Sequence, residues 1–168
     1  MNTKTVTTTD LNGNHYEVSV KELTWRPTAN AIIFQDDQLL VVKVDGAYHL
    51  PGGGVELGET PEAGVVREVL EETGLKVSRP QLIGSLTSFF AYSAFDSEKV
   101  THAQSLLLYY LCKRIGGELS QDMLEDYEKA ANMTPSWLPV KELGNITVGS
   151  TVDWRPIVKQ ALSFEHTS

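Results

Sequence analysis

The sequence predicts a single domain of the α/β class. Its 168 residues suffice for one hydrophobic core and are few for two, and 41% hydrophobic with 21% charged residues is ordinary for a globular protein. Apolar runs of strand length stand on both sides of a central segment with helix end signals, and an amphipathic helix is expected at 152–164. We therefore expect one domain over 1–168, with 1–26 as a strand or hairpin extension.

That extension is the first element. Residues 1–10 are polar and indicate a frayed tail, the Asn-Gly-Asn sequence at 12–14 predicts a turn, and polar and apolar residues alternate through 15–20 as in a strand. Trp25, just before Arg-Pro, is expected to pack within the protein or at a dimer interface, with stacking on a nucleobase as the alternative.

A hairpin of buried strands is expected next. Apolar residues fill 31–34 and 39–44, and the polar residues 35–38 between them predict the turn. Asp45-Gly46 predicts another turn, which brings the chain to residues 48–51 and a glycine-rich loop.

The segment after this loop has the signals of a short helix. Thr60 is a good N-cap, Pro61 suits the first helical position, and Gly74 can adopt the left-handed conformation that ends a helix. At about 100° per residue, the helix has an apolar side of Val65, Val66, Val69 and Leu70 and an acidic side of Glu68, Glu71 and Glu72. The apolar side must face a core.

The acidic side predicts a bound cation. Like charges at i,i+3 and i,i+4 repel each other, and the C-terminus of a helix is itself partially negative. Several carboxylates suit Mg²⁺ or Mn²⁺, which prefer hard oxygen ligands. Gly64 lies one turn earlier on this side and costs about 1 kcal/mol relative to Ala, which predicts the close approach of a loop or ligand. The alternative is a solvated acidic face on which Arg67 pairs with Glu71.

Strands are expected to dominate the chain beyond Gly74. Apolar residues predict strands at 75–77, 82–92, 104–112 and 137–140, and an acidic helix is expected within 120–131. Residues 93–102 are polar and predict a mobile, substrate-facing loop. The single cysteine, Cys112, lies in an apolar strand and is expected to be a buried, inert thiol.

Charge and hydropathy argue against several classes of function. A net charge of −8 disfavours DNA and RNA as partners, because nucleic acids usually meet a basic surface. One cysteine cannot form an internal disulfide, the first ten residues lack an apolar leader, and no apolar run approaches about 18 residues. We expect a cytoplasmic protein without membrane spans.

Residues 53–75 resemble the Nudix hydrolase box, G-x5-E-x7-R-E-U-x-E-E-x-G-U, in which U is a bulky aliphatic residue. Every fixed position is present: Gly53, Glu59, Arg67, Glu68, Glu71, Glu72 and Gly74, with Val69 and Leu75 at the aliphatic places. At ordinary residue frequencies, chance would produce this match in fewer than about one in 10⁵ chains of this length. A looser resemblance extends over most of the chain, with Tyr48 where many members have Trp.

The resemblance implies an α/β/α sandwich around a mixed β-sheet and a hydrolase that acts on phosphoric anhydride bonds. Members of the family typically cleave a nucleoside diphosphate linked to another moiety, by attack of a metal-activated water on phosphorus. Mg²⁺, with Mn²⁺ as a substitute, would neutralise phosphate oxygens and lower the pKa of the water. The expected partner is a small-molecule nucleotide, and a homodimer stays open.

The resemblance also implies roles for single residues. The metal ligands would be Glu68, Glu71, Glu72 and the carbonyl of Gly52, with Glu68 also the base or water-orienting group. Glu59 and Arg67 are expected to hold these glutamates in place. A further carboxylate is expected among Glu98, Glu118, Glu125 and Glu128, with Glu98 and Glu128 ranked first, and the alternative for each is a solvated surface charge. His49 and His102 are either proton carriers or structural.

Substrate contacts are expected from the glycines Gly52, Gly53 and Gly54 and from Tyr92 and Phe95. Members that cleave dinucleoside polyphosphates carry a Tyr close to the place of Tyr92, whereas Phe90 replaces the Pro that marks ADP-ribose-cleaving members. ADP-ribose-like compounds and oxidised nucleoside triphosphates stay open as substrates. The alternatives to hydrolysis are a non-catalytic, nucleotide-binding regulatory domain and, ranked lower, an isomerase.

Overall fold

Two β-sheets form the centre of the protein, whose computed structural model describes residues 4–93 and 99–165. The larger sheet contains β1 (Thr5–Thr9), β2 (His15–Ser19), β3 (Leu23–Trp25), β4 (Thr28–Ile32), β8 (Gly52–Gly54), β9 (Leu75–Ser93) and β10 (Val100–Gly117). Its order is β2-β1-β9-β10-β4-β8, with β3 also paired to β10. Because β10 runs antiparallel to β9 and parallel to β3 and β4, the sheet is mixed, as predicted.

The smaller sheet is antiparallel and contains β5 (Phe34–Gln35), β6 (Gln38–Val44), β7 (Ala47–His49) and β11 (Thr134–Pro139). The chain passes from the larger to the smaller sheet at Ile33, between β4 and β5. Asp36 and Asp37 then adopt positive φ angles of 49° and 59°, which is the turn geometry that fits a two-residue hairpin. The predicted hairpin is therefore present, although its first half pairs in the other sheet.

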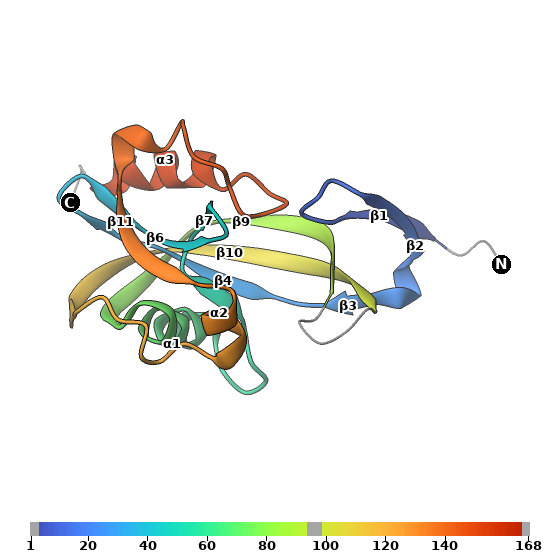
Figure 1. Ribbon diagram of the computed structural model, residues 1–168, viewed down its shortest axis with the longest axis horizontal. Helices are drawn as coiled ribbons and strands as arrows, with labels where there is room; N and C mark the ends of the chain where they lie inside the picture. Colours follow the sequence, from blue (N-terminus) through green and yellow to red (C-terminus); the bar gives the residue numbers. More distant parts are fainter. Residues whose placement is uncertain (1–3, 94–98, 166–168) are drawn as a thin grey trace.

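Helices lie on both sides of the sheets (Figure 1). The helix α1 (Pro61–Thr73) covers one face, α3 (Arg155–Glu165) covers the other, and the short α2 (Asp126–Ala130) lies near α1. Short 3₁₀ turns occupy Val20–Glu22 and Val140–Glu142. The predicted α/β/α sandwich is confirmed. Within the described residues, no helix is long and apolar enough to cross a membrane.

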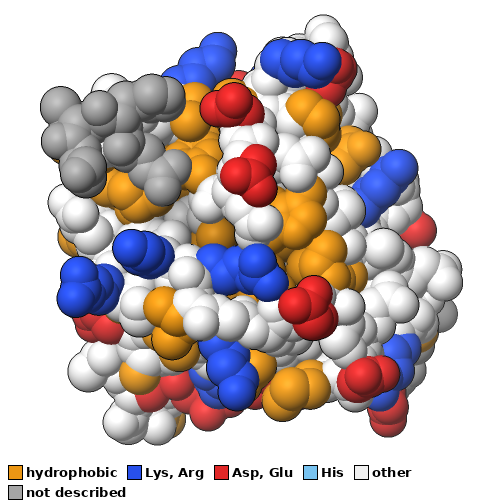
Figure 2. All heavy atoms as spheres, turned by 90° about the vertical axis from the view of Figure 1, so that its left-hand side faces the viewer, with side chains coloured by type: hydrophobic (Ala, Val, Ile, Leu, Met, Phe, Trp, Pro, Cys, Tyr) orange, Lys and Arg blue, Asp and Glu red, His pale blue; other side chains and the backbone are white. Residues whose placement is uncertain are grey.

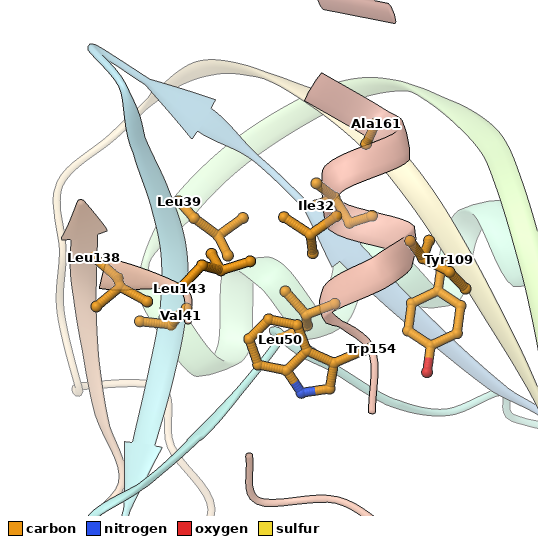
Figure 3. Close-up of a cluster of buried hydrophobic side chains, with 11 residues drawn as sticks. Ile32, Leu39, Val41, Leu50, Tyr109, Leu138, Leu143, Trp154 and Ala161 are labelled. Atoms are coloured by element: carbon orange, nitrogen blue, oxygen red, sulfur yellow. The ribbon is translucent and has the colours of Figure 1, made fainter. Parts of the chain in front are cut away.

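Each helix packs on its own hydrophobic cluster. Val65 and Val69 of α1 are fully buried against Ala31, Ile33 and Tyr110 of the larger sheet. On the opposite face, α3 and the segment before it pack against residues of both sheets; Figure 3 shows this second cluster, which includes Ile32, Leu39, Val41, Leu50, Tyr109, Leu138, Leu143, Trp154 and Ala161. The apolar side predicted for α1 therefore faces a core.

Three local predictions are wrong. The expected frayed tail contains β1, which pairs with β2 to form the hairpin and meets β9 at Thr9 and Phe90. The glycine-rich loop is the strand β8, held by pairing with β4. The two strands expected around Pro80 are one, because Arg79, with φ of 53°, and Pro80 fall at a register shift opposite β10 that accommodates the residue without an N–H.

On the face of the molecule seen in Figure 2, acidic and basic side chains are mixed, and neither kind forms a patch of its own. Figure 2 views the molecule from the left of Figure 1 and shows acidic, basic and hydrophobic side chains interspersed on that face. Trp25 is 58% exposed, so the expected packing of this side chain inside the chain is wrong, and a dimer interface stays a prediction.

Candidate active site

The acidic helix α1 begins and ends as predicted. The Oγ1 of Thr60 accepts a hydrogen bond from Ala63 N–H at 3.2 Å, Pro61 occupies the first turn, and Gly74 has φ of 73° and donates its N–H to Leu70. A Cβ at Gly74 would lie 2.5 Å from the carbonyl oxygen of Glu118, so the backbone of this neighbouring segment also leaves room only for glycine. These ends fix which residues of α1 meet β8.

Arg67 connects the loop before α1 with the acidic side of the helix. Its Nη2 lies 2.7 Å from Glu59 Oε1 and its Nε 3.3 Å from Glu59 Oε2, while Nη2 also donates to the carbonyl of Gly54 at 3.1 Å. Its Nη1 lies 2.9 Å from both Glu68 Oε1 and Glu71 Oε2. These partners raise the pKa of Arg67, chiefly through Glu59, and the same pair lowers the pKa of Glu59.

Gly64 and Gly53 make room for two of these carboxylates. A Cβ at Gly64 would lie 2.9 Å from Glu59 Oε1, and a Cβ at Gly53 would lie 2.5 Å from Glu68 Oε1. The close approach predicted at Gly64 is therefore present, and the group that approaches is Glu59. Glu68 lies directly against β8, where its burial raises the pKa of the carboxyl despite the opposing effect of Arg67.

Glu72 is the most buried of the three carboxylates on the acidic side of α1, with 6% of its surface exposed. Its Oε2 accepts a hydrogen bond from the Gly52 N–H at 2.8 Å. Burial, followed by the charges of Glu68, Glu128 and Glu71, raises the pKa of Glu72 well above its ordinary value. Gly52 itself has φ of 147°, and a Cβ there would collide with the carbonyl oxygen of Ala29 on β4, so only glycine can occupy this position.

Glu128 of α2 joins the box carboxylates from outside. It is 4% exposed, its Oε2 accepts from Glu125 N–H at 2.7 Å, and its charge contributes to the raised pKa of both Glu68 and Glu72. Among the other candidates, the Glu118 side chain is 97% exposed and lies 3.7 Å from Arg114. Glu98, like Phe95, lies outside the described residues.

The carboxylate oxygens of this group are the ligands that a hard divalent cation prefers. In this structure, Arg67 occupies one oxygen each of Glu68 and Glu71. Burial and mutual repulsion disfavour so many negative charges together unless positive charge compensates them. As the side chains stand, Glu68 and Glu71 direct oxygens to Arg67, and Glu72 directs one to a backbone N–H. Within residues 4–93 and 99–165, no three His, Cys, Asp or Glu side chains converge on one point that could hold a metal ion. The donor set fits Mg²⁺ if Glu68 and Glu71 rotate so that the oxygen of each that does not accept from Arg67 points to the ion.

A cavity of about 610 Å³ adjoins the β8 edge of this site. Tyr92 lines it, as do His49, Thr28 and Arg26. Thr28 pairs with Gly54 in the sheet, and the Nε of Arg26 lies 3.7 Å from the place of a Gly54 Cβ. The cavity and the acidic group thus meet the same short strand, as a phosphate chain that extends from one to the other would require.

The two histidines differ in surroundings. Burial lowers the pKa of His49, which favours the neutral imidazole at the cavity wall. His102 lies in β10 rather than in the predicted loop, with its Nδ1 2.8 Å from Thr8 Oγ1 and its ring 5.5 Å from that of Tyr16. These contacts tie the N-terminal hairpin to the sheet and favour a structural role for His102.

Sequence reasoning missed most of the cavity. In the sequence, Arg26 is merely the residue between Trp25 and Pro27, and no pattern distinguishes Asp10, Asn12 and Tyr16 of the hairpin as cavity residues. The signal in the sequence is a basic residue beside a tryptophan, which is weak without knowledge of which strands pair.

Comparisons with known proteins agree with the fold. The NUDIX domain model matches residues 24–158. The chain is 38% identical over 96 residues to a putative mutator protein MutT4 of Mycobacterium tuberculosis and 39% identical over 95 residues to an ADP-ribose pyrophosphatase of Methanocaldococcus jannaschii. These matches cover 57% and 54% of this chain, and 34% and 52% of the two relatives, so the chain spans about half or less of their lengths. A mutator MutT protein from Bacillus halodurans has a similar structure, with a TM-score of 0.63 at 25% identity over 82% of each chain.

Proposed function

Because the chain belongs to the Nudix family, we propose that it is a metal-dependent pyrophosphohydrolase that cleaves a nucleoside diphosphate linked to another moiety. The observation that carries this proposal is the group formed by the buried Glu72 and Glu128 with the partly buried Glu68, with Glu71 at its edge. A folded protein gains little from gathering carboxylates in a poorly solvated place unless a cation is to be bound there.

The residues that would hold Mg²⁺ or Mn²⁺ are Glu68, Glu71, Glu72 and Glu128, with the carbonyl of Gly52. Such an ion, when bound, neutralises phosphate oxygens and lowers the pKa of a bound water. Replacing any of the four glutamates by a neutral side chain would remove a negative charge from the site.

The protein's own side chains have the remaining tasks. Glu68, whose pKa is raised by burial, is the group we propose to accept the proton of the attacking water. Arg67 positions Glu68 and Glu71, and Glu59 positions Arg67. The backbone of Gly52, Gly53 and Gly54 borders the phosphates, and Arg26 supplies a positive charge where the cavity begins.

The substrate is a small nucleotide derivative. Phe90 stands where ADP-ribose-cleaving members have Pro, yet one relative is named an ADP-ribose pyrophosphatase, so this compound belongs in the test with dinucleoside polyphosphates and oxidised nucleoside triphosphates. Tyr92 lines the cavity and is proposed as a substrate contact. Phe95, which lies outside the described residues, is proposed as a substrate contact from the sequence alone. The buried Cys112 suits the reducing cytoplasm, and exposed Trp25 is the residue proposed for a homodimer contact.

One observation favours a second candidate, a nucleotide-binding regulatory domain without turnover. Arg67 pairs with both Glu68 and Glu71, so these two charges are compensated inside the protein. In a domain that only binds nucleotides, Glu68 and Glu71 could stay paired with Arg67, because no metal ion would require their oxygens.

A substrate panel distinguishes the two candidates. Wild-type protein is incubated with the compounds above in Mg²⁺, in Mn²⁺ or in EDTA, and the products are identified by chromatography. We expect release of a mononucleotide only with metal, and a loss of at least about 100-fold in kcat for Glu68→Gln. Glu118→Gln, which changes a nearly fully exposed carboxylate, serves as the control and should retain the parent rate. Binding of nucleotide without any turnover would support the regulatory domain.

A further inference from the structure

The N-terminal hairpin forms one wall of the cavity beside the acidic site. Asp10, Leu11 and Asn12 of its turn, with Tyr16, face the loop at 149–151 that precedes α3, and β9 and β10 supply the floor. Figure 1 shows the hairpin projecting beyond the two helices, with its turn directed back towards that loop. The hairpin precedes residue 24, where the match to the NUDIX domain model begins.

Hydrogen bonds hold the hairpin turn in one conformation. Asp10 Oδ1 accepts from the N–H groups of Asn12 and Asn14 at 2.9 Å each, and Oδ2 accepts from Asn14 Nδ2 at 2.9 Å and from Tyr16 Oη at 3.1 Å. Gly13 has φ of 82°, which completes the turn. A turn ordered in this way can bind a ligand without first losing conformational freedom.

Asn12 presents an unused amide in this wall. Its side chain is exposed to solvent and makes no hydrogen bond with any residue in the part of the chain that the structure describes. A side-chain amide offers two donors and one acceptor, the combination that pairs with the edge of a nucleobase. On the floor, the rings of Phe90 and Tyr92 stack with centroids 5.3 Å apart, and the guanidinium of Arg26 lies 5.6 Å from the centroid of Tyr92.

A second observation also points to a polar ligand. Ser105 of β10 lines the cavity, is fully buried, and has an Oγ without a hydrogen-bond partner among the described residues. An unpaired buried hydroxyl costs about 1–3 kcal/mol in the free protein. Arg26 likewise makes no ion pair within residues 4–93 and 99–165. The cavity therefore combines aromatic rings, an amide, an unpaired hydroxyl and a cation, and its volume lies within the usual range of about 300–1,000 Å³ for small-molecule sites.

We propose that the hairpin turn selects the nucleobase of the substrate. The nucleoside lies in the cavity against Phe90 and Tyr92, the Asn12 amide binds the edge of the base, and Arg26 contacts the phosphate that leads to β8. This inference rests on the proposed function in that it names the part of the substrate which the cavity holds. It assigns base selection to a segment that precedes the residues matched by the NUDIX domain model.

Binding measurements without turnover test this inference. The dissociation constants of AMP, GMP, CMP and UMP are measured by calorimetry in EDTA for wild type, Asn12→Ala and Glu17→Gln. Glu17 is exposed on the same hairpin and outside the cavity, so its variant controls for damage to the hairpin. We expect the wild type to prefer one base, Asn12→Ala to bind that nucleotide about five- to tenfold more weakly and to lose the preference, and Glu17→Gln to match the wild type.

A second variant covers the event that Asn12→Ala disturbs the turn. Ser105→Ala should bind the preferred nucleotide more weakly, while the melting temperature of the ligand-free protein stays equal or rises because the unpaired hydroxyl is gone. The inference is overturned if wild type binds none of the four nucleotides, or if Asn12→Ala keeps both affinity and preference. Because the experiment uses neither metal nor hydrolysis, an inactive protein that shows the expected binding pattern would contradict the proposed function alone.

Discussion

Arg67 and Glu59 form a two-armed ion pair, with Nη2 2.7 Å from Oε1 and Nε 3.3 Å from Oε2. The pair joins the loop before α1 to the second turn of the helix. Since Nη1 of the same guanidinium holds Glu68 and Glu71, the position of Glu59 is transmitted to two proposed metal ligands. The placement of Glu68 and Glu71 therefore depends on the planar, forked guanidinium of an arginine.

Arg67→Lys is expected to lower kcat about 10- to 100-fold with little change in fold, because a lysine ammonium cannot bind Glu59 with two arms and still reach Glu68 and Glu71. Steady-state kinetics and a thermal melt provide the measurement. Arg155→Lys is the matched control, since Arg155 makes a similar two-armed pair with Asp153 at the start of α3, outside the site. Equal kinetics for Arg67→Lys and wild type would contradict a positioning role.

Gly64→Ala is expected to lower kcat without lowering the free energy of unfolding. The new methyl group would lie 2.9 Å from Glu59 Oε1, so the flexible end of Glu59 must shift away from Arg67. Alanine also stabilises a helix by up to about 1 kcal/mol relative to glycine, so the free energy of unfolding should not fall. Urea denaturation and kcat are compared with those of Gly144→Ala, whose methyl group meets open space. Full activity of Gly64→Ala would show that the Glu59 contact is dispensable.

Glu72 should make the metal-free protein less stable as the pH rises. Burial raises the pKa of Glu72 above its ordinary 4.5, so the folded protein holds this proton more tightly than the unfolded chain does. The free energy of unfolding in EDTA should accordingly decline from about pH 4.5 upward, through the raised pKa. Glu72→Gln keeps an oxygen that can accept from Gly52 N–H but cannot ionise, so it should reduce the decline between pH 5 and pH 8. An unchanged pH slope in Glu72→Gln, with Glu118→Gln as the reference, would contradict this origin.

Cys112 should be inert in the folded protein. It is 4% exposed, and burial raises the pKa of its thiol to about 12, so the thiolate fraction near pH 8 is very small. A thiol reagent such as dithionitrobenzoate should react with the native protein only at the rate of unfolding and at once in denaturant. Rapid, stoichiometric labelling of the native protein would instead indicate a reactive cysteine.

Features set by neighbours in sequence were predictable. Thr60 begins the helix α1 by a local hydrogen bond, and Gly74 ends it in the left-handed conformation. The Asp45-Gly46 pair turns the chain with positive φ angles of 48° and 84°. The proximity of Glu68, Glu71 and Glu72 follows from helical geometry alone. The burial of Glu72 against Gly52 and of Glu68 against Gly53 requires pairing of β8 with β4, which glycines do not signal.

Features set by distant segments were not predictable in the same way. The strand β9 continues through Pro80 because a register shift against β10 accommodates this residue, and Thr5–Thr9 is a strand because β2 and β9 pair with it. The cavity joins Asn12, Arg26 and Ser105 with the loop before α3, and no local pattern brings these together. The sequence offers four candidates for the further carboxylate, with Glu98 and Glu128 first, and only the burial of Glu128 on α2 separates it from the exposed Glu118 and Glu125.

The central claim, that the acidic side of α1 binds a divalent cation, is tested most directly by a crystal structure grown in Mn²⁺ with anomalous data at the manganese edge. We predict an anomalous peak bound by oxygens of Glu68, Glu71 and Glu72, with Glu68 and Glu71 each bound through the oxygen that does not accept from Arg67. Carboxylates that stay on Arg67 and on Gly52 N–H at saturating Mn²⁺, with no peak between them, would contradict the account.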